Sequence, residues 1–303
     1  MKHWTTDNIP SQKGKVFLVT GANSGTGFEA SRVLAQKGAK VVMAVRNWDK
    51  GTLAKEKIHK EMPSADIELM HLNLADLISI EKFSVEFTNN HKQLDVLINN
   101  AGIALPNERE ETEQKFEAHF GTNHLGHFAL TGRLLPILKN THNSRIVTVA
   151  SFVPNHSGSV IRWEDLQHKN AFDGMVAYGQ SKLANIMFAL SLEDMLKGSS
   201  ISILSVLANP GFTRSGIQKG MGIMARIWTR ILAQEVGMGV LPILRAATDL
   251  AVKGGEFYSP LKMKEMRGYP ELTQSPENAL LTEDRQRLWK ISEEMTLIHY
   301  NFD

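Results

Sequence analysis

Residues 16–27 read Val-Phe-Leu-Val-Thr-Gly-Ala-Asn-Ser-Gly-Thr-Gly. The apolar and β-branched run Val16–Thr20 predicts a buried strand, and Phe28–Lys37 predicts a helix that Gly38 ends. The glycines between them allow a tight turn and let a bound phosphate approach the backbone, toward which the helix N-terminus directs free N–H groups. Taken alone, such a loop is equally compatible with an ordinary turn. Its place between a strand and a helix favours a cofactor loop.

Short apolar runs alternate with helical stretches along the rest of the chain. We expect further strands at Lys40–Val45, Ile67–Leu72, Asp95–Ile98, Arg145–Ala150, Ile201–Leu207 and Glu256–Tyr258. We expect further helices at Trp48–Met62, Leu77–His91, Thr112–Leu138, Val176–Leu196, Glu235–Val252 and Glu277–Met295. This alternation predicts βαβ units with right-handed crossovers. The expected fold is therefore α/β, of the Rossmann type, with a doubly wound parallel sheet and helices on both faces.

We find no internal repeat, low-complexity segment or linker in the chain, so a single domain over residues 1–303 is the better interpretation. Residues 211–234 mix glycine, methionine and basic side chains and predict a substrate lid. Residues 277–296 predict a C-terminal helical tail, with Leu280, Leu281, Leu288 and Ile291 spaced for one apolar face.

Composition excludes several classes of function. The chain has 303 residues, 42% of them hydrophobic and 22% charged, with a net charge of +2, which gives no reason to expect a nucleic acid partner. The absence of cysteine excludes disulfides, thiolate zinc sites and cysteine nucleophiles. The polar N-terminus lacks the apolar core of a signal peptide, and no stretch approaches the roughly 20 apolar residues of a membrane span. We therefore expect a cytoplasmic protein without a membrane anchor.

Tyr178 and Lys182 are four residues apart in Tyr178-Gly179-Gln180-Ser181-Lys182, which places both on one helix face. A free tyrosine has a pKa of about 10, and a neighbouring ammonium should lower that pKa by stabilising the phenolate. Ser151 is a hydroxyl at the end of the predicted strand Arg145–Ala150. A proton donor with a supporting hydroxyl is what hydride transfer to a carbonyl needs. The alternatives are an ordinary helix tyrosine with a solvated lysine, and a serine that only caps the next turn.

The predicted second strand ends in Val45-Arg46-Asn47. In dinucleotide-binding folds this strand end meets the adenosine ribose, where a carboxylate favours NAD and an arginine accommodates a 2′-phosphate. No carboxylate is present here, and Arg46 follows directly. We therefore expect NADP(H) as the cofactor, the alternative being that Arg46 is a solvated surface residue.

The chain resembles the short-chain dehydrogenase/reductase family from about residue 13 to 260. The resemblance rests on motifs that occur in the family's order, namely Thr20–Gly27, Asn99-Asn100-Ala101-Gly102, Ser151, Tyr178 with Lys182, and Pro210-Gly211. Within the family the chain looks most like the retinol-dehydrogenase-like and protochlorophyllide-reductase-like oxidoreductases. That narrower likeness rests on Thr20–Gly27, Val45-Arg46-Asn47, Asn123-His124-Leu125-Gly126-His127-Phe128 and Leu288-Trp289.

The resemblance implies a role for each matching residue. Tyr178 would be the acid in reduction and the base in oxidation, and Lys182 would tune it and bind the nicotinamide ribose. Ser151 would hold the substrate oxygen, and Asn123 would hold a water in a proton relay. Asn99 would help to steady the sheet. Cofactor contacts are implied for Gly21, Asn23, Ser24, Gly25, Thr26, Gly27, Arg46, Asn73, Leu74, Asn100, Ala101, Gly102, Tyr178, Lys182, Pro210, Gly211 and Thr213.

Two further implications of the resemblance concern the adenine and the assembly. Asn73 stands where the family often has aspartate, and its carbonyl oxygen can still accept a bond from the adenine amino group. The helices equivalent to Thr112–Leu138 and Val176–Leu196 would form a homodimer or homotetramer. The polar N-terminus lacks the apolar anchor of microsomal retinol-active relatives, which argues against a retinoid substrate.

The sequence therefore predicts an NADP-dependent reductase of aldehydes or ketones with apolar bodies, although neither the substrate nor the direction can be read from it. Reduction of an activated C=C bond remains an alternative, as does an NADP-binding sensor that does not turn over. His119, His124 and His127 lack a carboxylate at ligand spacing, so we expect packing histidines and no metal. Residues 221–228 either line an apolar pocket or pack a lid.

Overall fold

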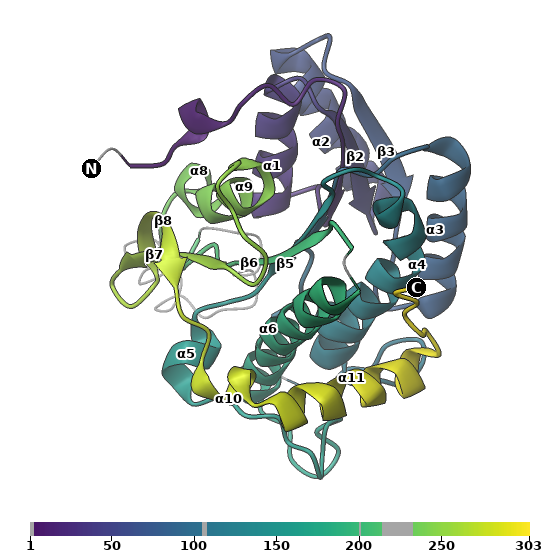
Figure 1. Cartoon of the computed structure of the whole chain (residues 1–303), viewed down its shortest axis with the longest axis vertical. Helices are drawn as coiled ribbons and strands as arrows, with labels where there is room; N and C mark the ends of the chain where they lie inside the picture. Colours follow the sequence, from purple (N-terminus) through teal and green to yellow (C-terminus); the bar gives the residue numbers. More distant parts are fainter. Residues whose placement is uncertain (1–2, 105–107, 200, 214–232) are drawn as a thin grey trace.

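The computed structural model describes residues 3–104, 108–199, 201–213 and 233–303 (Figure 1). These residues contain one sheet in the order β3-β2-β1-β4-β5-β6-β7-β8, in which the first seven strands are parallel and β8 is antiparallel to β7. The strands are β1 (Val16–Thr20), β2 (Lys40–Val45), β3 (Ile67–His71), β4 (Val96–Asn99), β5 (Arg145–Val149), β6 (Leu204–Ala208), β7 (Phe257–Lys262) and β8 (Arg267–Thr273). The predicted doubly wound α/β fold is confirmed.

Helices pack on both faces of the sheet because its central strands are buried on both sides. They are η1 (Thr6–Asn8), α1 (Gly25–Gln36), α2 (Trp48–Glu61), α3 (Leu77–Asn90), the π-helical η2 (Phe120–Leu125), α4 (Gly126–Lys139), α5 (Val153–Ser157), α6 (Gly174–Gly198), α8 (Val236–Gly239), α9 (Leu241–Thr248), α10 (Glu277–Leu280) and α11 (Thr282–Thr296). In β1, Phe17 and Val19 join the core under α1, α2 and α9, whereas Leu18 joins the core under α3, α4 and α6.

Most predicted elements are present, but three predicted helices differ from the structure. The helix predicted over Glu277–Met295 is divided into α10 and α11 by the extended residue Leu281, and Leu280 and Leu281 are exposed rather than part of the predicted apolar face. The helix predicted over Thr112–Leu138 begins only at Ala118, because residues 112–117 form a turn closed by a bridge between Glu111 and Glu117. The helix predicted over Glu235–Val252 is divided into α8 and α9, with Pro242 in the first turn of α9. Proline suits such a helix start, because its missing N–H would have no partner within the helix there.

Strand β8 was not predicted, and the expected strand Glu256–Tyr258 is the beginning of the longer β7. Gly268 and Pro270 interrupt the apolar pattern of β8, which hides it in the sequence. The turn that joins the two strands contains Met263, Lys264 and Glu265 with φ values of 52°, 55° and 63°. A left-handed conformation costs non-glycine residues on the order of 1 kcal/mol each, so contacts elsewhere must stabilise this turn.

The helix α11 and the segment after it lie along α6 and α4 (Figure 1). Trp289 packs against Phe128 with ring centroids 5.1 Å apart, and the Tyr300 hydroxyl donates to the Phe128 carbonyl at 2.6 Å. At Gly132 an added Cβ would lie 2.5 Å from Ile298. The C-terminal residues thus cover part of the two helices at which the family resemblance implied self-association.

Candidate active site

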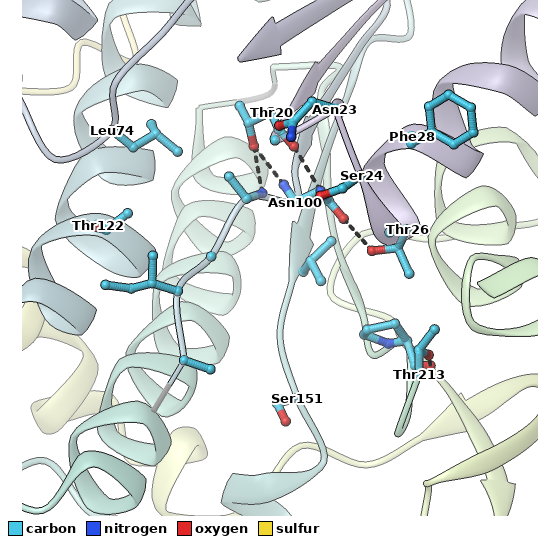
Figure 2. A pocket seen from close by; sticks show the side chains of 18 of the residues that line it. Thr20, Asn23, Ser24, Thr26, Phe28, Leu74, Asn100, Thr122, Ser151 and Thr213 are labelled. Atoms are coloured by element: carbon cyan, nitrogen blue, oxygen red, sulfur yellow. Dashed lines mark hydrogen bonds between the residues drawn. The ribbon is translucent and has the colours of Figure 1, made fainter. Parts of the chain in front are cut away.

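A cleft of about 1060 Å³ opens at the carboxyl ends of the parallel strands, where the strand order reverses between β1 and β4 (Figure 2). Open α/β sheets bind ligands at this switch point. The predicted site residues that line the cleft are Gly21, Asn23, Ser24, Gly25, Thr26, Arg46, Asn73, Leu74, Asn100, Ala101, Gly102, Ser151, Tyr178, Lys182, Pro210, Gly211 and Thr213. Gly27 and Asn123 lie behind this lining rather than in it.

The glycine loop brings the N-terminus of α1 close to the end of β1. Gly21 has a φ of 66°, and an added Cβ there would lie 3.0 Å from Ala101. At Gly27 an added Cβ would lie 2.6 Å from the Gly21 carbonyl oxygen, so a larger residue would force the loop open. Ser24, the N-cap of α1, makes no side-chain capping bond. The loop therefore presents helix N–H groups to the cleft, which suits a pyrophosphate.

Asn100 and Thr20 hold this loop against the end of β4 (Figure 2). The Asn100 Nδ2 donates to the Thr20 carbonyl at 2.9 Å, and the Thr26 hydroxyl donates to Asn100 Oδ1 at 2.8 Å. The Thr20 Oγ1 accepts bonds from the N–H groups of Asn100 and Ala101, both at 2.9 Å. Asn99 lies outside the cleft and donates to Thr131 on α4 at 2.9 Å. Thr20 is thus a central residue that the sequence analysis did not single out.

Three cations line the cleft where it follows β2. Arg46 follows β2 as predicted, and Lys50 and Lys57 on α2 join it. The side chain of Asn47 caps α2 by accepting the Lys50 N–H at 2.9 Å, which orients this helix at the cleft. Within the residues that the structure describes, none of the three cations forms an ion pair. Sequence reasoning missed both lysines, although their spacing on a helix after Arg46 was a usable signal.

Asn73 lines the cleft, but its side-chain oxygen already accepts the N–H of Ala75 at 3.2 Å. This bond forms a short turn after β3. A carbonyl oxygen has a second lone pair, so the implied bond from an adenine amino group stays a prediction.

Ser151, Tyr178 and Lys182 meet at the end of β5 within the same cleft. Tyr178 and Lys182 lie one turn apart on α6, with Lys182 Nζ 5.8 Å from the centre of the Tyr178 ring. The Ser151 hydroxyl accepts the Val153 N–H at 3.2 Å and lies close enough to Tyr178 to oppose the rise of its pKa. Ser151 therefore caps the next turn and also lies beside Tyr178, the predicted acid. Both interpretations of this serine from the sequence fit the structure.

The expected lowering of the Tyr178 pKa by Lys182 is wrong for this structure. Burial raises the pKa of Tyr178 above its usual value, and only the hydrogen bond with Ser151 opposes that rise. The reason is geometric, because Lys182 Nζ donates to the Val149 carbonyl at 3.1 Å. Burial lowers the pKa of Lys182 itself to about 8. This lysine therefore titrates closer to neutrality than a solvated one.

Asn123 connects Ser181 on α6 to Ile103 in the chain that follows β4. Its Oδ1 accepts the Ile103 N–H at 2.9 Å, and its Nδ2 donates to the Ile103 carbonyl at 3.1 Å and to Ser181 Oγ at 3.0 Å. Its backbone carbonyl accepts a bond from His127 Nδ1 at 2.9 Å. The side chain thus positions the helix that carries Tyr178, and the predicted water-holding role stays a prediction.

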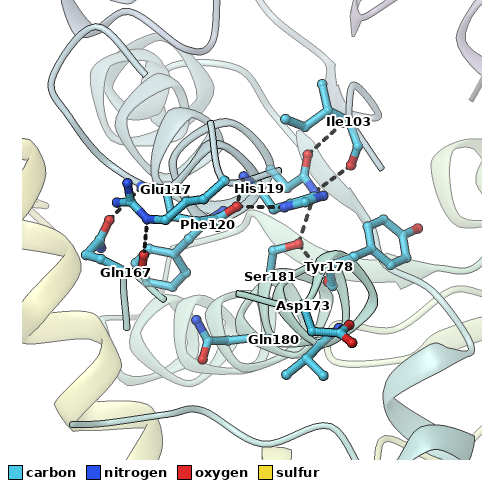
Figure 3. Close-up of polar contacts among 12 residues, drawn as sticks. Ile103, Glu117, His119, Phe120, Gln167, Asp173, Tyr178, Gln180 and Ser181 are labelled. Carbon is cyan, nitrogen blue, oxygen red and sulfur yellow. Dashed lines mark hydrogen bonds and ion pairs between the residues drawn. The ribbon is translucent and has the colours of Figure 1, made fainter. Parts of the chain in front are cut away.

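The loop before α6 is fixed by polar contacts that the sequence did not reveal (Figure 3). The Glu117 N–H donates to Gln167 Oε1 at 2.6 Å, and Gln180 on α6 donates to the Leu166 carbonyl at 3.0 Å. Asp173 caps α6 by accepting the N–H groups of Met175 and Val176. These bonds determine where α6 begins and hence where Tyr178 lies.

The three histidines that the sequence singled out have separate partners. His119 Nδ1 lies 2.6 Å from Glu117, His124 Nε2 lies 2.8 Å from the Ser292 hydroxyl, and His127 Nε2 lies 3.0 Å from the Thr20 hydroxyl. Burial lowers the pKa of His124 to about 3 and that of His127 to about 4, so both are neutral. The described part of the chain contains no group of three side chains placed to ligate a metal.

Apolar side chains line the mouth of the cleft. They are Phe152, Val153, Met175 and Phe212. Most of the lid predicted at 211–234, including residues 221–228, lies outside the described residues.

The lowered pKa of Lys182 predicts a pH-dependent stability. An unfolded lysine has a pKa of about 10.4, so between pH 8 and that value the unfolded chain binds more protons and the free energy of unfolding rises with pH. Below pH 8 Lys182 is charged in both states, so the cost of burying its ammonium lowers the free energy of unfolding in full. Lys182→Met should have the higher free energy of unfolding at pH 7. Its difference from the wild type should narrow by about 2 kcal/mol by about pH 9.5. Denaturant unfolding of both proteins measures this, and a constant gap would contradict it.

Comparisons with known proteins identify relatives of this chain. The model of the family described as short chain dehydrogenase matches residues 15–224. Mouse retinol dehydrogenase 11 is 42% identical over 215 residues, which cover 71% of this chain and 66% of that protein. Mouse retinol dehydrogenase 12 is 34% identical over 292 residues, covering 95% of this chain and 88% of that protein. The crystal structure of an uncharacterized protein from Mycobacterium paratuberculosis is 33% identical, with a TM-score of 0.82 over 99% of this chain and 100% of that one.

Proposed function

Since the chain belongs to the short-chain dehydrogenase family, we propose that it is an NADP(H)-dependent oxidoreductase that interconverts an apolar aldehyde or ketone and the corresponding alcohol. The meeting of Ser151, Tyr178 and Lys182 with the glycine loop in one cleft carries this proposal. A binding protein without turnover has no need for a proton donor and a hydroxyl beside its cofactor loop.

The cleft fits a nicotinamide dinucleotide. The loop Gly21–Gly27 would hold the pyrophosphate, because only glycine fits the close approaches at its two ends. Arg46, Lys50 and Lys57 would surround a 2′-phosphate, which supports NADP(H) over NAD(H). Pro210–Thr213 would hold the nicotinamide. When bound, the cofactor supplies or accepts the hydride.

The side chains supply the proton and the polarisation. In reduction Tyr178 would donate its phenolic proton to the substrate oxygen, which gains negative charge as the hydride arrives. The Ser151 hydroxyl would donate a hydrogen bond to the same oxygen. Lys182, whose Nζ is bonded to the Val149 carbonyl, would bind the nicotinamide ribose. In oxidation the phenolate would accept the alcohol proton.

The substrate proposal rests on the apolar cleft mouth around Phe152, Met175 and Phe212. Long apolar aldehydes suit such a surface. Two of the relatives carry the name retinol dehydrogenase, so retinal and retinol belong among the compounds to test.

The deciding experiment follows NADPH oxidation by the purified protein with aliphatic, aromatic, steroid and retinoid carbonyls, and with enones. Turnover of an apolar aldehyde or ketone to its alcohol supports the proposal. Saturation of the C=C bond of an enone would instead favour double-bond reduction. Tight NADPH binding without turnover of any compound would favour the sensor.

The oligomeric state of the chain and its place in the cell are proposals. A homodimer or homotetramer is expected by analogy, but the surface expected for it on α4 and α6 is partly covered by Trp289 and Tyr300. Light scattering of the purified chain measures its oligomeric state.

Across the described residues, none of the helices is both long and apolar enough to span a bilayer.

A further inference from the structure

The turn between β7 and β8 has an unfavourable backbone conformation. Met263, Lys264 and Glu265 are consecutive non-glycine residues in the left-handed region. In that region the Cβ of an L-residue approaches the following carbonyl oxygen too closely. Such conformations persist only where surrounding contacts determine them, and they cluster at functional sites.

On one side the turn contacts the cleft wall formed by residues 209–213. The Asn209 Nδ2 donates to the Glu265 carbonyl at 3.2 Å, and the Phe212 N–H donates to the Met266 carbonyl at 2.9 Å. At Gly211 an added Cβ would lie 2.5 Å from the Met266 carbonyl oxygen. The turn thus determines the position of the wall assigned to the nicotinamide.

On the other side the Glu265 carboxylate contacts the wall that follows Ser151. Its two oxygens lie 3.2 Å and 3.0 Å from Asn155 Nδ2, which donates to them. Asn155 belongs to α5, and its N–H donates to the carbonyl of Phe152 at 3.1 Å. Figure 1 shows β7, β8 and α5 on the same side of the molecule. Glu265 therefore bonds to the wall of residues 209–213 through its backbone carbonyl and to Asn155, in the wall that follows Ser151, through its carboxylate.

The carboxylate is buried and depends on neutral donors. Glu265 is only 8% exposed, and Thr273 Oγ1 is its second side-chain donor. No lysine, arginine or histidine of the described ranges pairs with it. A buried carboxylate needs its hydrogen-bond donors, so the bond to Asn155 holds firmly and the two walls are coupled.

We infer that Glu265 is a positioning residue that sets the placement of the nicotinamide relative to the substrate oxygen held at Ser151. The inference rests on the proposed function, because it takes residues 210–213 as the nicotinamide wall. A misplacement of about 1 Å between reacting groups can lower the rate of a reaction about 100-fold. Within the part of the chain that the structure describes, the hydrogen bonds of Glu265 go to Asn155, Thr273 and Asn209, and none goes to the proposed adenosine contacts at Gly21–Gly27 and Arg46. Loss of the coupling should therefore lower kcat and leave the affinity for NADPH nearly unchanged.

Exchanging the donor and the acceptor of the Asn155–Glu265 hydrogen bond tests this inference. Glu265→Gln turns an N–H group toward one of the two donors, and Asn155→Asp places two carboxylates against each other. Each change should lower kcat by about 10-fold or more. The double variant Asn155→Asp with Glu265→Gln restores the bond between positions 155 and 265 in reversed order but not the bond from Asn155 Nδ2 to the Gln274 carbonyl at 3.3 Å, so it should recover part of kcat. Glu271→Gln, on the same hairpin but 47% exposed, is the matched control and should leave kcat unchanged.

The emission of bound NADPH adds a readout that needs no turnover. The single variants should change the emission and lifetime of the bound nicotinamide at nearly constant NADPH affinity, and the double variant should partly restore both. Unchanged kcat and emission in the folded single variants would overturn the inference, as would their failure to recover in a folded double variant. If emission responds while no carbonyl reacts, the proposed substrate class fails and the positioning role stands. A wild-type protein that does not bind NADPH would overturn both.

Discussion

Replacement of Tyr178 by phenylalanine is expected to lower the turnover number at least about 1000-fold, which corresponds to about 4 kcal/mol of transition-state stabilisation. The variant keeps the ring between Lys182 and Ser151 and removes only the hydroxyl. Without that hydroxyl the oxygen that gains charge during hydride transfer has no proton donor. Ser151 and Lys182 remain, but Lys182 Nζ is bonded to the Val149 carbonyl. Steady-state NADPH oxidation with the best carbonyl substrate measures the loss.

Cofactor binding separates a loss of chemistry from a loss of structure. NADPH affinity in Tyr178→Phe should stay within about 3-fold of wild type, since the glycine loop and Arg46 are untouched. Tyr258→Phe is a matched control, because the Tyr258 hydroxyl donates to Glu256 at 2.7 Å outside the cleft. That control should remain active. More than a tenth of wild-type turnover in Tyr178→Phe would show that another group donates the proton.

The central sheet and the cofactor loop were predictable because their signals are local. A β-branched run and its glycines appear in the twelve residues from Val16 to Gly27, a helical pattern follows over Phe28–Lys37, and the structure forms β1, the loop and α1 from these residues. Strand β8 was not predictable, because Gly268 and Pro270 break the pattern that identifies strands. Its strand character comes from pairing with β7, a contact that local sequence does not encode.

The site was predictable as a set of residues but not as a set of interactions. Spacing on a helix was enough to pair Tyr178 with Lys182. It did not show that Lys182 donates to Val149 or that the side chain of Asn123 is occupied by Ile103 and Ser181. Such bonds depend on how separate segments approach each other. For the same reason sequence reasoning missed Glu265, which contacts the cleft walls through Asn209 and Asn155.

Replacement of Arg46 by aspartate is expected to reverse the cofactor preference. The affinity for NADPH should fall roughly 100-fold, because a carboxylate repels the 2′-phosphate where a guanidinium could bind it with two parallel bonds. NADH should be used better than before, since aspartate can accept a bond from the ribose 2′-hydroxyl. Titration of each cofactor and kcat/KM with each measure the change. Arg46→Lys keeps the charge without the two-bond geometry and should give an intermediate value.

The remaining cations decide how complete the reversal becomes. Lys50 and Lys57 stay in the cleft of the Arg46→Asp variant and still attract phosphate, so residual NADPH binding should weaken steeply with salt, as expected for exposed charges. Adding Lys57→Gln should reduce that residual affinity further and leave NADH unaffected. The exposed Lys60, on the same helix but outside the cleft lining, is the control position. Equal losses for NADPH and NADH in Arg46→Asp would mean that Arg46 supports the fold of the cleft and does not read the 2′-phosphate.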